Sequence, residues 1–493
     1  MAGERITIPR LEGLVHLVRD GEGILRVQVQ RPRRLEARLL GRDPRDAIFL
    51  VQTIGADSGV SHALAAVLAL ENALGLSVPP NGFTARDLLH ALSLLHAHLR
   101  HFYLQVLPDY LPLSALADYA GNNLQLARVA TSLAGEGASR WASSPVRNRF
   151  TGAQSSDLVE HLHASLGMLN TLQRMLAQLG GKFPVAMTVT PGGMSIRLSE
   201  AQIMPLERRM QVISGFLSEE VLSDIGLLLQ RFPELGSLGH GLGEYLSGGS
   251  LGAESGGETA MFPAGAVLNN RLVPFAGGIT ESLATSRYRV KTGGDGSGPV
   301  LSENDEAPPS ASWIKAPRLA GRIVDVGPLA RTVIAHMTAA TSRQAELVAE
   351  IESRLGTSVQ SANTVAGRLF ARVGEMALLA VRCIENLQRL QPGQAYAEPV
   401  SDDMPDAQEA AAAIEAPGGT AWHRMGLRRG RIAYYDIVSP GTWHGAPATP
   451  GSTAGSLEVA LNSAGLNPER DADRVALSRI VHSFAFSATD AVQ

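Results

Sequence analysis

Three histidines in one apolar segment have the residue type and close spacing that metal binding uses. His96, His98 and His101 are two and three positions apart, so on a helix His98 and His101 share a face while His96 points elsewhere. Neutral imidazole is a common metal ligand, but histidines beside Phe102 and Tyr103 more often pack in a core or form structural hydrogen bonds. We therefore interpret all three histidines as structural residues.

Other short motifs with a chemical role are weak or absent in this sequence. The glycine-rich runs at 248–252 and 277–278 resemble phosphate-binding loops, but neither follows a strand and opens a helix with the required spacing. The chain contains no His-Glu-x-x-His or Cys-x-x-Cys sequence. These motifs therefore name no reaction.

The pattern of apolar residues predicts a helix-dominated core that follows a short N-terminal hairpin. Short apolar or alternating runs flank a charged turn at 20–23, as in a hairpin. Longer runs with helical period are separated by glycine and proline clusters. The expected strands are 6–8, 15–19, 24–30 and 431–438, and the expected helices are 61–74, 84–107, 156–179, 219–230, 329–354 and 361–390.

Length and composition fit one large globular protein. Of the 493 residues, 45% are hydrophobic and 18% charged, and the net charge of -4 argues against nucleic acid as a partner. We expect a single domain over 1–493, with loop-like surface insertions at about 247–258, 292–312 and 398–417. The single cysteine, Cys383, lies in an apolar helical run and is interpreted as a core residue.

The sequence also predicts where the protein resides. No apolar stretch follows the first residues as in a signal peptide, and no stretch reaches the length that a membrane span needs. We therefore expect a cytoplasmic protein with no direct membrane span, which would associate with a membrane only through a partner.

Two segments, one near each end of the chain, carry a resemblance to a known family. The large, metal-carrying subunit of NiFe-hydrogenases has the motifs Arg-Ile-Cys-Gly-Val-Cys-x-x-x-His and Ser-Phe-Asp-Pro-Cys-x-x-Cys-x-x-His, which align on 53–62 and 483–493. Blocks at 41–47, 95–103 and 326–331 also resemble the family, in family order. The resemblance implies an α+β, mainly α fold, with a helical bundle core and small antiparallel sheets.

The residues that depart from the family pattern are those of its metal site. The four cysteine positions read Gly55, Ser58, Ser487 and Asp490, and the position of an arginine that the family places over its iron reads Gly418. The family holds nickel and iron with four thiolates, and neither glycine nor hard oxygen replaces soft sulfur. The resemblance therefore implies a degenerate member with no catalytic residue, no cofactor and no metal of its own.

Other positions of the site keep the residue types of the family. Glu12 matches a glutamate thought to pass protons, Glu36 matches a magnesium ligand, and His62 matches the histidine of the first motif. A different, hard cation is a weaker alternative, because two neutral hydroxyls make a poor site. Its oxygen ligands would come from Asp57, Ser58, Ser487 and Asp490.

Two functions from different classes follow from this resemblance. A non-catalytic, large-subunit-like protein would be a structural or assembly partner of an iron–sulfur small subunit or of hydrogenase maturation proteins, and iron–sulfur clusters are then expected only in the partner. Alternatively, an oxidoreductase subunit would use the emptied metal cavity for a quinone-like organic ligand and electron transfer. The second function needs a suitable lining near Asp57, His62, Trp443 and His444. We favour the first.

Overall fold

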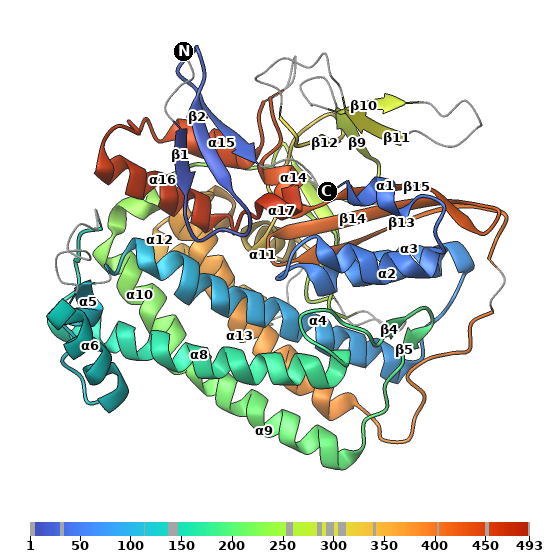
Figure 1. Cartoon of the computed structure of the whole chain (residues 1–493), viewed down its shortest axis with the longest axis horizontal. Coiled ribbons are helices and arrows are strands. Elements are labelled where there is room, and N and C mark those ends of the chain that lie inside the picture. The colour runs from blue at the N-terminus through green and yellow to red at the C-terminus, as the bar shows by residue number, and fades with distance from the viewer. Residues whose placement is uncertain are drawn as a thin grey trace.

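Four long helices form the body of the molecule (Figure 1). They are α4 (Pro80–His101), α8 (Gly152–Gly180), α9 (Glu200–Phe216) and α13 (Val365–Arg389). α4 packs against α8 and α13, and α13 packs against α9. The computed structural model describes residues 5–29, 34–112, 114–136, 146–252, 260–282, 288–291, 300–303, 312–338, 342–401, 404–448 and 453–491.

Local sequence determines where these helices begin and end. Thr151 accepts a hydrogen bond from the N–H of Gln154, whose side chain accepts one from the N–H of Thr151. This capping box satisfies two donors at the start of α8. The helix that begins within the first motif, α3 (Gly59–Leu74), ends at Gly75, where φ is 63°. Glycine adopts this left-handed conformation without the steric cost that a Cβ brings.

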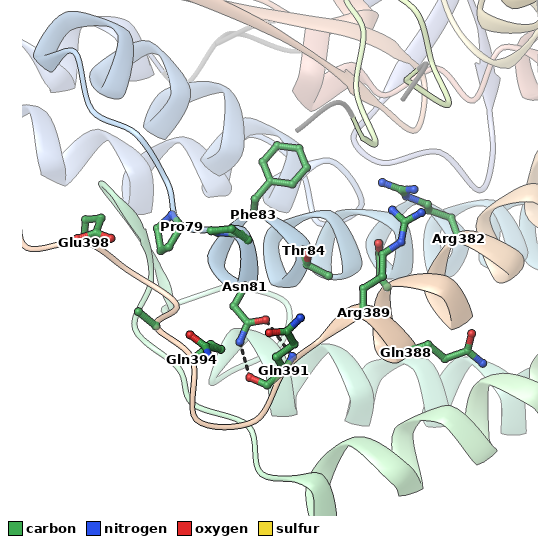
Figure 2. A pocket seen from close by; sticks show the side chains of 13 residues that line it. Pro79, Asn81, Phe83, Thr84, Arg382, Gln388, Arg389, Gln391, Gln394 and Glu398 are labelled. Atoms are coloured by element: carbon green, nitrogen blue, oxygen red, sulfur yellow. Dashed lines mark hydrogen bonds between the residues drawn. The ribbon is translucent and has the colours of Figure 1, made fainter. Parts of the chain in front are cut away.

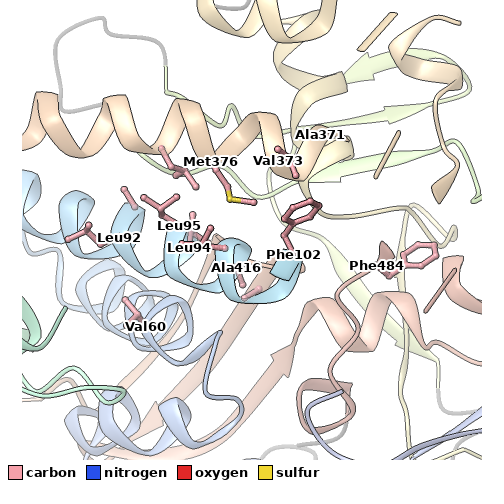
Figure 3. Packing of buried hydrophobic residues seen from close by; sticks show 14 of the residues in the cluster. Val60, Leu92, Leu94, Leu95, Phe102, Ala371, Val373, Met376, Ala416 and Phe484 are labelled. Carbon is pink, nitrogen blue, oxygen red and sulfur yellow. The ribbon is translucent and has the colours of Figure 1, made fainter. Parts of the chain in front are cut away.

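Fully buried apolar side chains hold the helices together. Leu95 of α4 and Met376 of α13 lie in the layer where these two helices pack, and both are 0% exposed (Figure 3). Phe102 continues this layer beyond the end of α4, in a π-helical turn at Phe102–Val106. Burial of apolar surface, at about 25 cal/mol per Å², is the main stabilising term for such a bundle.

Small antiparallel sheets flank the helices. An N-terminal sheet contains β1 (Arg5–Ile8), β2 (Val15–Arg19) and β3 (Leu25–Val29). A C-terminal meander contains β13 (Ala407–Ala416), β14 (Gly419–Arg428) and β15 (Arg431–Val438), and α3 packs against β13 and β14. The expected α+β, mainly α fold is confirmed.

The remaining elements connect this frame. The short helices and strands before the middle of the chain are α1 (Leu35–Leu39), α2 (Pro44–Leu50), α5 (Ser114–Ala117), α6 (Leu124–Glu136), β4 (Val189–Thr190), β5 (Gly193–Met194), α10 (Leu222–Arg231) and β6 (Tyr245–Ser247). Those that follow are β7 (Gly265–Leu268), β8 (Arg271–Val273), β9 (Ile279–Ser282), β10 (Tyr288–Lys291), β11 (Val300–Glu303), β12 (Ala316–Leu319), α11 (Pro328–Met337), α12 (Ser342–Leu355), α14 (Pro440–His444), α15 (Ser456–Ser463), α16 (Asp471–Ser483) and α17 (Ala488–Ala491). Single turns of 3₁₀ or π-helix lie at Val51–Thr53, Leu107–Asp109, Leu217–Val221, Pro233–Gly236 and Val359–Ser361.

The structure corrects several expected elements. The stretch 398–417 is not loop-like throughout, because 407–416 form β13. The single helix expected over 329–354 is two helices, α11 and α12. The sequence pattern predicts no helix at α9. The helix expected over 219–230 is a π-helical turn at Leu217–Val221 followed by α10. Of the other two expected insertions, residues 253–258, 292–299 and 304–311 lie outside the described part of the chain.

A group of buried charges lies between the helices and the C-terminal meander. Arg331 of α11 donates to Glu375 of α13 at 3.0 and 2.7 Å and to Glu415 of β13 at 2.7 Å. His98 donates to Glu375 at 2.9 Å and accepts from Arg372 at 3.0 Å. Burial alone would raise the pKa of Glu375, but Arg331 and then His98 lower it to about 2. The charged carboxylate therefore joins α4, α11 and α13.

A second buried carboxylate joins the two ends of the chain. Glu458 of α15 accepts from the N–H of Val27 in β3 at 2.9 Å, and it pairs with Arg26 at 3.2 Å. Burial raises the pKa of Glu458 from 4.5 to about 6. The hairpin is thereby attached to the C-terminal helices.

Replacing Glu458 with glutamine is expected to change how stability depends on pH. A carboxyl group with a raised folded pKa holds its proton more tightly in the folded state, so its contribution is present below pH 4.5 and is lost as the pH rises through about 6. Glu458→Gln should therefore gain stability relative to the wild type across this window. Thermal midpoints measured at a series of pH values check this, and parallel curves for the two proteins would contradict it.

Candidate functional site

Three segments that are far apart in sequence meet near the C-terminal end of the chain (Figure 1). The loop between β1 and β2 carries Glu12, whose Oε1 accepts from the N–H of Ala56 at 2.6 Å. The backbone oxygen of Glu12 accepts from the N–H of Ala488, at the start of α17, at 2.9 Å. The first motif, the N-terminal loop and the C-terminal segment are thus bound to one another.

Asp490 is the centre of this meeting point. Its Oδ1 accepts from Ser58 Oγ at 2.9 Å and from His62 Nε2 at 3.3 Å. Its N–H donates to Ser487 Oγ at 3.1 Å, and that hydroxyl contacts Glu12 Oε2 at 3.3 Å. Asp490 is 5% exposed and His62 is 0% exposed. Burial, with the negative charge of Asp490 as a further cause, raises the pKa of Glu12.

Ser58 stands at the N-cap position of α3. The sequence predicts Ser61 as the N-cap, but Ser58 occupies that position and α3 begins at Gly59. The Ser58 hydroxyl makes no capping bond to the helix, since it donates to Asp490 instead. The Ser61 hydroxyl lies 3.2 Å from His90 Nε2.

A chain of buried side chains extends from Asp490 into the C-terminal meander. His62 Nε2 lies 3.3 Å from the Asp490 carboxylate, and His62 Nδ1 lies 2.8 Å from His423 Nε2. His423 Nδ1 in turn lies 2.9 Å from the Tyr435 hydroxyl. Burial, and then the neighbouring His62, lowers the pKa of His423 well below its ordinary value. His423 is therefore neutral near pH 7, and each ring nitrogen of the two histidines is used within the protein.

Gly55 lies against oxygen atoms of the Asp490 group. A Cβ added at Gly55 would be 2.8 Å from Ser58 Oγ, 3.0 Å from Glu12 Oε2 and 3.4 Å from Asp490 Oδ1. The first of these distances is shorter than side-chain atoms tolerate. Hydrogen-bonded oxygen atoms thus occupy the space that a side chain at Gly55 would enter.

Gly418 lies in the turn between β13 and β14, next to the same C-terminal segment. Its carbonyl oxygen accepts from His444 Nε2 at 3.0 Å. An added Cβ would be 3.0 Å from Pro440 Cβ and 3.7 Å from the backbone oxygen of Ala485. Gly418 therefore borders the site but brings no charge to it.

Glu36 lies apart from the Asp490 group, on α1. Its Oε1 accepts from the N–H of Ile437 and pairs with Lys315 Nζ, each at 2.8 Å. Lys315 also pairs with Glu281 at 2.8 Å. An ammonium group already neutralises the carboxylate that the resemblance assigns to magnesium. The described residues therefore do not fit a magnesium ion here. Gln493, which stands at the terminal histidine of the second motif, lies outside them.

Comparison with known proteins supplies the identity. The sequence matches the nickel-dependent hydrogenase family over residues 33–156 and 140–486. The chain belongs to the nickel-dependent hydrogenase family. It is 26% identical to the hydrogenase-2 large chain of Escherichia coli strain K12, over 92% of this chain and 89% of that protein. It is also 26% identical to the periplasmic NiFeSe hydrogenase large subunit of Desulfomicrobium baculatum, over 87% of this chain and 82% of that protein.

Solved hydrogenases share the fold of this family member. The Ni-Fe-Se hydrogenase of D. vulgaris Hildenborough in the reduced state superimposes with a TM-score of 0.83 at 22% identity, over 99% of each chain. The NiFeSe hydrogenase of Dm. baculatum gives a TM-score of 0.83 at 24% identity, again over 99% of each chain. The agreement extends over nearly the whole chain.

The residues present do not fit a nickel–iron centre. Nickel and iron need soft thiolate ligands, whereas the chain has one cysteine, Cys383, which is buried in α13. Burial raises the pKa of its thiol, which disfavours the thiolate form. Within the described ranges, no group of three or more His, Cys, Asp or Glu side chains is arranged to hold a metal ion.

The structure brings together most of the residues that the sequence singles out. The six residues that converge around Asp490 or contact its partners are Glu12, Gly55, Ser58, His62, Ser487 and Asp490. That four of these stand at ligand positions stays a prediction from the resemblance. Asp57 is turned to Arg100, which donates to it at 3.0 Å, so Asp57 does not join a hard-cation site.

The other two histidines of the 95–103 block have partners within the protein. His101 Nε2 donates to the backbone oxygen of His482 at 2.7 Å, and His96 Nε2 lies 3.2 Å from the Gln173 amide. The sequence did not link His423 to His62, because 361 residues separate them. For Tyr435 the sequence held one weak indication: the alternation of the expected strand 431–438 places this residue on one face of the sheet.

Proposed function

We propose that this chain is a non-catalytic, hydrogenase large-subunit-like protein that acts as a structural or assembly partner, pairing with an iron–sulfur small subunit. One observation carries the proposal: hydrogen-bonded oxygen atoms and a glycine fill the place where the resemblance expects four thiolates. The relatives are named large chain or large subunit, which implies a smaller partner for those proteins. Iron–sulfur clusters then belong to the partner.

Exposed apolar side chains next to the site support such pairing. Phe49 on α2 is 37% exposed, Met187 is 50% exposed and Leu14 is 43% exposed. The Gln52 side chain exchanges hydrogen bonds with the backbone of Ala186 at 2.9 and 2.7 Å, so the segments of Phe49 and Met187 are neighbours. Leu14 belongs to the loop that carries the site glutamate. Contiguous apolar patches mark protein interfaces, so we propose that these segments meet the partner.

The pairing is tested by co-expression with the small-subunit-like iron–sulfur protein of the same host. We expect the two chains to co-purify, with the absorbance of iron–sulfur clusters in the complex. Phe49→Glu and Met187→Glu should reduce recovery of the partner at least about tenfold, because a charge would be buried at the interface. Val212→Glu is the matched control, since Val212 is 62% exposed on α9. Equal recovery with all three variants would contradict the proposed interface.

Restoring four cysteines is not expected to restore hydrogen turnover. A side chain at Gly55 would place its Cβ only 3.0 Å from Glu12 Oε2, and Gly418 would still provide no cation. Loss of the aspartate also removes the acceptor of His62, which is buried. Hydrogen uptake by the purified variant would overturn this prediction. The variant combines Gly55→Cys, Ser58→Cys, Ser487→Cys and Asp490→Cys.

The proposal includes a location. We place the complex in the cytoplasm, with any membrane association provided by the partner. Within the part of the chain that the structure describes, no helix combines the length and apolar character needed to cross a membrane.

The quinone-like alternative receives less support, because Asp57 and His62 are held by protein partners and Trp443 and His444 are buried.

A further inference from the structure

A cavity of about 280 Å³ lies between α3, α4 and β13, apart from the Asp490 group. Its wall is mainly apolar. Leu64 and Leu68 of α3 face Phe83 of α4 across it, with Phe262 and Ile414 completing the wall. None of these residues belongs to the Asp490 group.

The charged side chains at the wall are already paired within the protein. Arg86 donates to both oxygens of Glu71 at 2.9 and 2.6 Å. Asp87 accepts from Arg382 at 2.7 Å and from Asn386 at 2.9 Å. Arg86 and Asp87 are each 6% exposed. Among the described residues that line this cavity, a ligand therefore finds no unpaired charge to bind.

The cavity has a serine and a histidine but not a catalytic pair. Ser250 lies in Gly248–Gly252, which has the form Gly-x-Ser-x-Gly. A nucleophilic serine in such a motif stands on a strand-to-helix turn beside a histidine. Here the Ser250 backbone instead forms a bridge with Phe262, and its hydroxyl is buried with no partner among the described residues. His90 Nε2 is used by the backbone oxygen of Glu415 at 2.7 Å.

His90 adds no charge at neutral pH. Burial lowers the pKa of His90 to about 4, so its ring is an aromatic, uncharged part of the wall. The wall thus combines aliphatic and aromatic surface with ion pairs that are complete in themselves.

Phe83 connects this cavity to a larger, polar cleft of about 810 Å³. The cleft lies between the start of α4 and the end of α13, where Figure 2 shows Phe83, Arg382 and Arg389 along its upper side. Arg382 packs against Gly252, where any Cβ would collide with its guanidinium group. Phe83 and Arg382 therefore lie where the apolar cavity meets the polar cleft.

We propose that the apolar cavity binds a neutral aromatic molecule of about two fused rings. The volume of about 280 Å³ is large enough for a molecule of this size. Recognition is by shape and by contact with the Leu, Ile and Phe side chains. A charged analogue should bind more weakly, because the described residues of the wall offer it no unpaired charge. This inference does not depend on pairing with a small subunit.

Indole, a neutral molecule of two fused rings, is a direct probe for isothermal titration calorimetry on the full chain. We expect one site per chain. Leu68→Phe, which fills the cavity from α3, should weaken binding by about tenfold or more. Leu74→Phe is the matched control, because Leu74 is a partly buried leucine of the same helix that does not line the cavity. Indole-3-carboxylate should bind more weakly than indole.

Each outcome of this experiment decides the proposal. Binding of indole that is lost in Leu68→Phe but kept in Leu74→Phe supports it. No binding of indole to the wild-type chain, or equal binding by both variants, overturns it. Equal affinity for indole and its carboxylate overturns the assignment to a neutral ligand. Circular dichroism of both variants verifies that each is folded before titration.

Discussion

Arg331→Met should be among the most destabilising single substitutions in this protein, costing about 3–5 kcal/mol of the free energy of unfolding. Arg331 is 1% exposed and supplies the positive charge between Glu375 and Glu415. Removing one partner of a buried ion pair leaves an uncompensated charge, which costs far more than the pair contributes. A shift of the urea midpoint, followed by tryptophan fluorescence, measures the loss.

A surface arginine provides the control for this substitution. Arg343 pairs with Glu385 at 3.1 Å, but its side chain is 53% exposed, so Arg343→Met should cost less than about 1 kcal/mol. Arg331→Lys keeps the charge and loses the two-pronged geometry, so an intermediate loss is expected. Equal midpoints for Arg331→Met and Arg343→Met would show that the buried charges are not coupled as described.

Asp490→Ala should release the C-terminal helix from the body of the protein. The substitution removes the acceptor of Ser58 and His62, and hydrogen bonds to a charged group contribute about 1.5–3 kcal/mol. We expect a lower urea midpoint and faster hydrogen exchange at 488–491. Because His62 also loses its fixed orientation, exchange should rise at His423 in β14.

A nearby acidic residue serves as the comparison. Glu469 is exposed, and Glu469→Ala should change the free energy of unfolding by no more than about 0.5 kcal/mol. Unchanged exchange at α17 in Asp490→Ala would mean that the aspartate does not hold this helix. The same measurement on Ser58→Ala should give a smaller effect of the same kind, since one donor is lost and the charge remains.

Elements with strong local signals could be predicted from the sequence. The hairpin follows the alternation at 15–19 and its charged turn, and β15 coincides with the expected strand 431–438. α3 could be placed because glycine stops it at Gly75. Periodicity and stop signals act over a few residues, so one sequence contains them in full.

Elements that depend on distant partners could not be predicted. β13 contains the run Ala410–Ala413, and alanine has a low preference for strands. It becomes a strand because it pairs with β14 along its whole length and packs against α3. In α9, Pro205 lies inside the helix, where proline normally argues for an end. Tertiary contacts overrode local preference in both cases.

The candidate site shows the same division. The resemblance pointed to Ser58, Ser487 and Asp490, because the rest of each motif can still be aligned after its cysteines have been replaced. No local pattern pointed to His423 or Tyr435, which reach the site only through the meander. Their role follows from hydrogen bonds between segments hundreds of residues apart.

The mutually dependent hydrogen bonds around Asp490 make a stepwise return to cysteine unfavourable. A lone cysteine at one of the four positions would disturb its neighbours while the other three thiols were still missing, so each early reversal would cost stability and bring no catalysis in return. Natural selection would remove such intermediates one by one. On the proposed function, in which the four positions once held thiolates, restoring a metal site would therefore require replacing the whole cluster at once.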